Sequence, residues 1–337
     1  MAAAPYDPFL AGSFRVGVRT LRLRDTARGR VLPCALWHPC APGENGEPLP
    51  GPWPLVVYSH RGGGNGRSAT FLCGHLASHG YAVAAPDHSE VVVPELTARP
   101  GETAAEREAR VATVVAGRVP DVRLALARLL DGDPATAAGG VGLDAARVGL
   151  VGHSFGGWTV LATPDTEPRV RAVVAMAPAG SSRPRPGILP VTLDFAWTHT
   201  VATLVLAGDE DVMTPLDGIV EVFRRMPAPK RMFVLRGADH LHFGDDAEEA
   251  HESLRRFALP GDAAWIPSAM RPVAKLCPPD DAHAFARGLA LAHLDASLRD
   301  SRVAGAWLAD HATQALSARG IDAWEQRGPA PPVSGPG

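Results

Sequence analysis

The chain has 337 residues and a formal net charge of −3, from 33 lysines and arginines against 36 aspartates and glutamates. This near-neutral balance argues against a nucleic-acid-binding protein, which normally carries a basic stripe. Hydrophobic residues make up 46% and charged residues 20%, as is ordinary for a globular protein with a substantial core. The four cysteines lie too far apart for a paired-cysteine zinc or redox motif.

Neither a membrane span nor a targeting segment is visible. No stretch approaches the roughly 18 consecutive apolar residues that a spanning helix requires. The segment before Arg15 contains no basic residue and no long apolar run, so it does not read as a secretory signal. We therefore expect a cytoplasmic protein without a membrane span, and the sequence carries no signal for its oligomeric state.

Short apolar runs recur along the chain. Apolar and polar residues alternate over 14–19, and this stretch and residues 31–37 predict two antiparallel edge strands. The later runs are nearly continuous, which is typical of strands buried on both faces of a parallel sheet. These runs are Leu55–Tyr58, Tyr81–Ala85, Val148–Val151, Val170–Met176, Leu204–Ala207 and Met232–Leu235.

Helical patterns lie between the runs. Ser68 is predicted to cap a helix that ends before Gly80, and residues 121–130 place apolar side chains on one face. A stripe of Leu291, Leu294 and Leu298 predicts a last helix. Strands that alternate with helices predict an α/β fold, with a mostly parallel sheet and helices on both faces.

We expect a single domain over 1–327, with a catalytic core at about 55–250 and C-terminal helices at 281–320. Residues 328–337 are rich in proline and glycine and are predicted to form a flexible tail. Residues 90–118 begin with a part that contains two prolines and a glycine, and they continue with a stretch of acidic and basic residues that is predicted to be helical. We expect this segment to border or cover a pocket, with further pocket walls from 178–197.

The most informative motif is Gly152-His153-Ser154-Phe155-Gly156, which has the pattern G-x-S-x-G. Composition alone would supply about 0.15 such matches in this chain, so the context decides its meaning. The motif directly follows an apolar strand and precedes a segment that can open a helix, which is the strand–turn–helix setting of a nucleophile elbow. Ser154 is therefore the predicted nucleophile, against the alternative of an incidental serine in a glycine-rich turn.

A nucleophilic serine needs a histidine to take its proton and a carboxylate to orient that histidine. In this setting the carboxylate and then the histidine follow along the chain, on loops after later strands. Asp211 lies three residues past Gly208, far enough beyond the strand to turn back over the sheet edge. Asp209 and Glu210 are the alternatives, and we expect them to face solvent or cap the turn.

His240 is the predicted base, because it lies beyond a glycine turn after the run that ends at 235. His242 is the alternative. These histidines together with Asp239, Asp245 and Asp246 also raise the possibility of a metal site. Ligation needs three convergent groups with supporting contacts, and no further histidine cluster is evident, so we expect no metal.

Acyl transfer places negative charge on the former carbonyl oxygen, which two backbone amides usually stabilise. One amide is predicted to be that of Phe155, directly after the nucleophile. The other is expected from the loop Ser59-His-Arg-Gly-Gly-Gly-Asn65, whose glycines let the backbone approach a ligand closely. A merely flexible turn is the alternative for this loop.

These segments resemble serine hydrolases of the α/β-hydrolase superfamily, and most closely the branch of platelet-activating-factor acetylhydrolases, dienelactone hydrolase-like proteins and cutinase-like polyester hydrolases. The resemblance is carried by Ser59-His60 with its glycines, Leu76–Pro86, Gly152–Gly157, Gly208–Pro215 and Gly237–Phe243. It implies an α/β-hydrolase fold with an eight-stranded, mostly parallel sheet, carboxylic ester hydrolysis and no cofactor. It also supports Ser154, Asp211 and His240 in their roles, with the Phe155 and Gly62 amides as the oxyanion hole.

Two positions depart from the relatives. Acetylhydrolase-like proteins have a small residue after the loop histidine, whereas this chain has Arg61, so Arg61 or Gly62 supplies the second amide. Dienelactone hydrolases proper use a cysteine nucleophile, whereas this chain has Ser154, so their substrate is not carried over.

The expected function is therefore a serine-dependent carboxylic ester hydrolase that acts on a small-molecule ester through an acyl-enzyme. An acyltransferase or amidase with the same residues is one alternative, and a catalytically silent ligand-binding protein is another. Arg61 at the pocket mouth would favour substrates with a carboxylate or phosphate. The alternative for Arg61 is a solvent-facing side chain.

Overall fold

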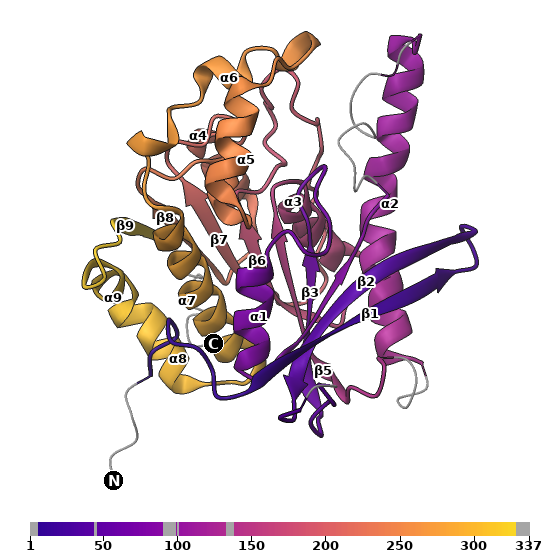
Figure 1. The fold of residues 1–337 in the computed structure, drawn as a ribbon, viewed down its shortest axis with the longest axis vertical. Coiled ribbons are helices and arrows are strands. Elements are labelled where there is room, and N and C mark those ends of the chain that lie inside the picture. The colour runs from indigo at the N-terminus through magenta and orange to yellow at the C-terminus, as the bar shows by residue number, and fades with distance from the viewer. Residues whose placement is uncertain (1–5, 44–45, 90–98, 100, 133–137, 328–337) are drawn as a thin grey trace, which may run out of the picture.

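The structure is a computed structural model that describes residues 6–43, 46–89, 99, 101–132 and 138–327. Within these residues one nine-stranded sheet has the order β1-β2-β4-β3-β5-β6-β7-β8-β9 (Figure 1). The strands are β1 (Arg15–Asp25), β2 (Arg30–Cys40), β3 (Trp53–Ser59), β4 (Ala82–Pro86), β5 (Leu143–His153), β6 (Val170–Met176), β7 (Ala202–Gly208), β8 (Lys230–Leu235) and β9 (Ala323–Arg327).

The sheet is mostly parallel, as expected. Neighbouring strands from β4 to β8 pair in parallel, whereas β1 with β2, β2 with β4, and β8 with β9 pair antiparallel. The expectation of eight strands is wrong, because β9 adds a strand beyond β8. Its sequence, Ala-Trp-Glu-Gln-Arg, has no apolar run, and β9 is defined by its pairing with β8 rather than by a local pattern.

Helices cover both faces of the sheet (Figure 1), as predicted. The helices α1 (Thr70–Ser78), α7 (Pro279–Leu298) and α9 (Ala312–Ser317) pack on one face; α2 (Ala104–Leu130), α3 (Phe155–Ala162) and α4 (Leu216–Arg225) pack on the other. The remaining helices are α5 (Ala247–Arg256), α6 (Ile266–Ala269) and α8 (Arg302–Ala306), with short 3₁₀ turns η2 (Thr163–Asp165), η3 (His240–Phe243), η4 (Gly261–Ala263) and η5 (Val273–Lys275) and a π turn η6 (Trp307–His311). Among the described helices, none is long and apolar enough to cross a membrane.

The apolar runs face two separate cores. On β3, Leu55 and Val57 pack with the core under α2, α3 and α4, whereas Val56 and Tyr58 pack with the core under α1 and α7. All four are at most 1% exposed. Alternation of side chains between two covered faces explains why the run is apolar at every position.

The predicted Ser68 cap is wrong. The residue before α1 is Ala69, which makes no side-chain cap. Instead, the Asp245 carboxylate accepts hydrogen bonds from the amides of Thr70 at 2.7 Å and Phe71 at 3.2 Å. The cap comes from 174 to 175 residues away in the sequence, so a local pattern could not reveal it.

The structure describes only part of the predicted pocket border at 90–118 and none of the predicted tail. The acidic-basic stretch before 118 is helical, because α2 starts at Ala104 behind a capping box of Thr103 and Glu106. The rest of the proposed pocket border, residues 90–98 and 100, lies outside the described residues, as does the predicted tail at 328–337. A single domain over 1–327 stays a prediction.

Candidate active site

Ser154 occupies the sharp turn between β5 and α3. Its backbone has φ 60° and ψ −116°, a conformation that is costly for a residue with a side chain. The Ser154 amide donates to Met176 O at 2.8 Å, which holds the turn against β6. The turn thus lies at the carboxyl end of β5, in the centre of the parallel strands.

Glycine is required on both sides of this turn. A Cβ on Gly152 would lie 2.2 Å from Gly156 O, and a Cβ on Gly156 would lie 1.9 Å from Ser59 O. Both distances are far below a normal contact, and both involve backbone atoms. The motif glycines therefore allow the turn to pack directly against the end of β3.

Three side chains from separate loops form one continuous hydrogen-bonded chain. His240 Nε2 lies 2.7 Å from Ser154 Oγ, and His240 Nδ1 lies 2.7 Å from Asp211 Oδ2. Asp211 follows β7 and His240 follows β8, and each is only 4% exposed. These are the distances of a nucleophile, its base and the group that orients the base.

Further contacts fix the Asp211 carboxylate. Its Oδ1 accepts hydrogen bonds from the amides of Met213 and Thr214, both at 2.8 Å, and its Oδ2 accepts one from Thr214 Oγ1 at 2.7 Å. Thr214 Oγ1 also lies 3.2 Å from His240 Nδ1. Thr214 is not among the predicted site residues, although aspartate side chains commonly accept hydrogen bonds from the backbone amides that follow them in local aspartate turns.

The alternative residues have other partners. Asp209 Oδ1 accepts a hydrogen bond from the Gly237 amide at 2.6 Å, and Glu210 pairs with Arg271. His242 Nε2 lies 3.0 Å from Cys277 O, with its Nδ1 facing Asp239. The structure therefore brings Asp211 and His240 to Ser154 and directs the three alternatives elsewhere.

His153, the residue before Ser154, contacts the backbone of His240. Its Nε2 lies 2.9 Å from His240 O. Burial, and then the neighbouring His240, lowers the pKa of His153 well below its usual value, so the ring is neutral and its single proton lies on Nε2. His153 occupies one of the two variable positions of the G-x-S-x-G motif, so the pattern did not single it out.

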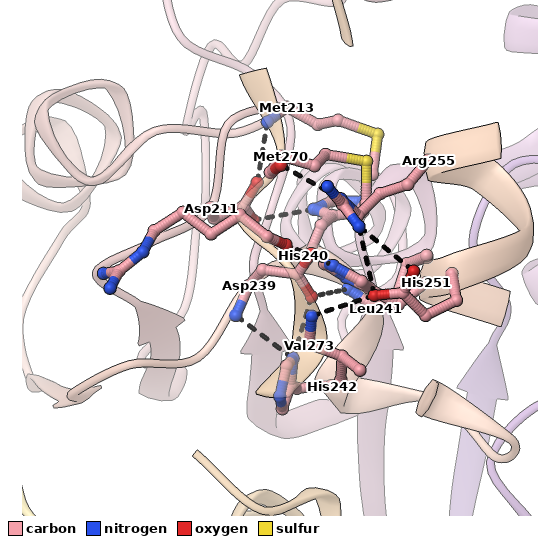
Figure 2. A network of polar contacts seen from close by, with 12 residues as sticks. Asp211, Met213, Asp239, His240, Leu241, His242, His251, Arg255, Met270 and Val273 are labelled. Atoms are coloured by element: carbon pink, nitrogen blue, oxygen red, sulfur yellow. Dashed lines mark hydrogen bonds and ion pairs between the residues drawn. The ribbon is translucent and has the colours of Figure 1, made fainter. Parts of the chain in front are cut away.

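A second buried cluster, formed by Asp239, His242 and His251, lies beside Asp211 and His240 (Figure 2). Asp239 Oδ1 lies 2.8 Å from His242 Nδ1, and Asp239 Oδ2 lies 2.5 Å from His251 Nδ1. The other ring nitrogen of His251 lies 2.8 Å from Arg271 O. Both His251 nitrogens thus lie close to oxygen atoms, an arrangement that favours the protonated ring.

The pKa values agree with this charge assignment. Burial alone would lower the pKa of His251, but its hydrogen bond to Asp239 and the charge of that carboxylate raise it above its usual value. Burial alone would raise the pKa of Asp239, but hydrogen bonds from His242 and His251 lower it. Within the described residues, no three or more His, Cys, Asp or Glu side chains are arranged to hold a metal ion.

The two amides that are predicted to form the oxyanion hole come from the start of α3 and from the loop after β3. Phe155 is the first residue of α3, so no carbonyl within the helix accepts from its amide. Gly62 lies in the loop after β3, and the last residue of that strand, Ser59, lies against Gly156 in the Ser154 turn. Arg61 is half-buried, and its Nη1 donates to Gly62 O at 3.2 Å, so the guanidinium folds back onto its own loop.

A pocket of about 360 Å³ lies beside the Asp211 loop. Its walls come from residues 178–189 after β6, within the expected 178–197 segment, and from residues 213–221 after β7. Ile188, Leu189 and Met213 give it an apolar surface. Two of its lining residues contact the site: Thr214 Oγ1 donates to Asp211 Oδ2 at 2.7 Å, and the Ala179 amide donates to Ser154 O at 3.1 Å.

Residues 44–259 match the dienelactone hydrolase family, and this match covers more than half of the chain. The protein therefore belongs to that family of hydrolases, within the α/β-hydrolase superfamily, as the motifs led us to expect. A ferulic acid esterase from Streptomyces cinnamoneus has a similar fold, with a TM-score of 0.61 and 24% identity over 89% of this chain and 93% of the esterase chain. This likeness, like the family match, agrees with the predicted α/β-hydrolase fold.

Proposed function

We propose that the protein is a serine-dependent carboxylic ester hydrolase that works through an acyl-enzyme. The observation that carries the proposal is the unbroken chain from Ser154 Oγ through the His240 imidazole to the Asp211 carboxylate, with 2.7 Å at each step. Membership in a hydrolase family supports the reaction class.

In the first step, Ser154 Oγ attacks the ester carbonyl carbon while His240 Nε2 takes the hydroxyl proton. The imidazolium that forms is stabilised by Asp211, which also holds the Nδ1 proton in place. The tetrahedral oxygen accepts hydrogen bonds from the amides of Phe155 and of Arg61 or Gly62. His240 then protonates the departing alcohol, which leaves the acyl group on Ser154.

In the second step, His240 takes a proton from water, and the resulting hydroxide attacks the acyl-enzyme carbonyl. The same two amides stabilise the second tetrahedral oxygen. His240 returns its proton to Ser154 Oγ, and the carboxylic acid is released. No cofactor enters either step.

The pocket beside Asp211 supports a proposal for the substrate class. Its apolar surface at Ile188, Leu189 and Met213 suits an apolar acyl or alcohol group of a small-molecule ester. Polar residues at its rim, among them Arg183 and Asp217, leave room for a polar substituent on that group.

A panel of chromogenic esters of increasing acyl length, together with a fluorophosphonate probe, tests the proposal. Ser154→Ala is expected to abolish labelling and to lower kcat by at least about 10⁴-fold. Ser253→Ala, an exposed serine on α5, serves as the matched control and is expected to behave as wild type. Labelling that survives Ser154→Ala would contradict the nucleophile. Faster transfer to added alcohols, or faster amide cleavage, would reassign the reaction class.

A further inference from the structure

A single arginine of α2 lies behind the loop that follows β3. Arg118 is fully buried, at 0% exposure. Its Nη1 donates to His60 O at 2.7 Å and to Ser59 Oγ at 3.1 Å, and its Nη2 donates to Arg61 O at 3.4 Å. The guanidinium thus contacts three consecutive residues, the last residue of β3 and the first two of this loop.

These contacts determine where the loop amides point. A trans peptide is planar, so its N–H is directed opposite to its C=O. The carbonyl of His60 shares a plane with the amide of Arg61, and the carbonyl of Arg61 shares a plane with the amide of Gly62. By holding both carbonyls on one side, Arg118 turns both candidate oxyanion amides toward the opposite side.

The same guanidinium also touches the other half of the proposed oxyanion hole. Its central carbon lies 4.2 Å from the centroid of the Phe155 ring, in a cation–π arrangement. Phe155 supplies the amide that directly follows the nucleophile. One rigid, planar side chain therefore packs against both segments from which the two amides come.

Neighbouring side chains hold this arrangement together. Ser59 Oγ lies 3.0 Å from His88 Nε2, and His88 Nδ1 lies 3.0 Å from Asp121 Oδ2. The His88 amide donates to His60 Nε2 at 3.0 Å, and His60 Nδ1 lies 2.7 Å from Arg61 O.

The protonation states in this network are consistent. Burial, and then the charge of Arg118, lowers the pKa of His60 and of His88 well below the usual value. With both rings neutral, His88 donates through Nδ1 to Asp121 and accepts from Ser59, while His60 donates through Nδ1 to Arg61 O. Ser59 in turn accepts from Arg118, so each contact has a donor and an acceptor.

We propose that Arg118 is the positioning residue of the oxyanion hole. Its guanidinium binds the carbonyls of His60 and Arg61 and packs on the Phe155 ring, and it thereby fixes the two segments that supply the amides. This inference rests on the proposed esterase function. Arg118 is completely buried and acts through the backbone amides that it orients, without touching substrate.

The test compares Arg118→Lys and Arg118→Met with wild type. Lysine keeps the charge but loses the planar fork, so it reaches fewer of the acceptors. We expect Arg118→Lys to lower kcat by about 10- to 100-fold and Arg118→Met by about 10²- to 10³-fold, with KM changed by less than about threefold. Arg128→Met is the matched control, because Arg128 lies on the same helix and contacts Arg24 O on β1. It should retain kcat within about twofold.

Binding of a boronic acid supplies a second readout, since its tetrahedral adduct occupies the oxyanion hole. The inhibition constant should rise in parallel with the fall in kcat/KM across the variants. A purely structural role would lower the melting temperature and leave kcat per folded molecule and the boronate affinity unchanged, and that result in Arg118→Lys would overturn the inference. Should Arg118→Met not fold, Arg118→Lys decides alone.

The outcomes for the inference and for the proposed function are distinguishable. If Ser154→Ala is as active as wild type, the proposed function fails and this inference fails with it. If Ser154→Ala is inactive while Arg118→Lys matches wild type in kcat and boronate affinity, only the role of Arg118 fails.

Discussion

Asp239 and His251 form a buried ion pair, with Asp239 Oδ2 and His251 Nδ1 2.5 Å apart. Asp239 directly precedes His240, whereas His251 lies on α5 (Figure 2). The pair therefore connects the loop that carries His240, the proposed base, to helix α5. Its strength depends on pH, because it requires a protonated imidazole and an ionised carboxylate.

The first prediction concerns this pH dependence. The pKa of His251 is raised in the folded protein, so its contribution to stability is complete below its ordinary value of 6.5 and is lost as pH rises through the folded value. His251→Gln should destabilise the protein by about 1–3 kcal/mol near pH 6, and the difference from wild type should shrink as pH rises further. Urea unfolding of both proteins between pH 5.5 and 9 measures this difference. A difference that is constant with pH would contradict the ion pair.

The second prediction concerns Thr214, which donates to the Asp211 carboxylate at 2.7 Å. A hydrogen bond to a charged group contributes about 1.5–3 kcal/mol, which corresponds to roughly a 10- to 100-fold effect. Thr214→Val keeps the shape but removes the hydroxyl, and we expect kcat to fall within that range. Thr214→Ser keeps the hydroxyl and should remain within about threefold of wild type. Equal rates for the Val and Ser variants, measured with one chromogenic ester, would exclude this role.

The third prediction tests the packing of the nucleophile turn. Gly156→Ala places a methyl group 1.9 Å from the backbone oxygen of Ser59, so the two segments must separate. We expect a loss of more than about 3 kcal/mol in stability or a failure to fold. Gly74→Ala on α1 is the control, because no atom beyond the neighbouring backbone of its own helix lies within 4 Å of the added Cβ. It should raise stability by about 0.5–1 kcal/mol, and thermal melts of both variants provide the comparison.

The fourth prediction concerns the cap of α1. Asp245→Ala removes the acceptor for the amides of Thr70 and Phe71 and should cost about 0.5–2 kcal/mol. Asp246→Asn is the control, since Asp246 makes no side-chain cap on α5, and its effect should stay below about 0.5 kcal/mol. Denaturant midpoints at neutral pH measure both changes. Equal midpoints for Asp245→Ala and wild type would show that the cap adds no stability.

The buried strands could be predicted, because their burial on both faces leaves a local pattern in the sequence. Five of the six apolar runs lie within a strand, and the sixth, Tyr81–Ala85, begins one residue before β4. A strand covered on both faces has apolar side chains at every position, as at Leu55–Tyr58. The strand β9 and the α1 cap were missed for a shared reason. Both are defined by partners that are distant in sequence, β8 in one case and Asp245 in the other.

The residues of the candidate site also differ in whether a local sequence pattern identifies them. Ser154, Asp211 and His240 could be named because a short motif and a fixed chain order identify them, and the structure places them within hydrogen-bonding distance. Thr214 is adjacent to a predicted residue and left a weak local signal. Arg118 has no such local signal, since it lies 57 to 58 residues from the backbone carbonyls that it contacts, and an arginine in a helix is ordinarily exposed.

The pairing of β9 with β8 has a consequence for truncated forms of the protein. Because β9 pairs along β8 from Arg231 to Leu235, a fragment that stops at residue 320 would bare one edge of the parallel strands. Exposed edge amides and carbonyls recruit strands from other molecules. Such a shortened fragment would be prone to self-association and insolubility, with the His240 loop only a few residues beyond the bared edge.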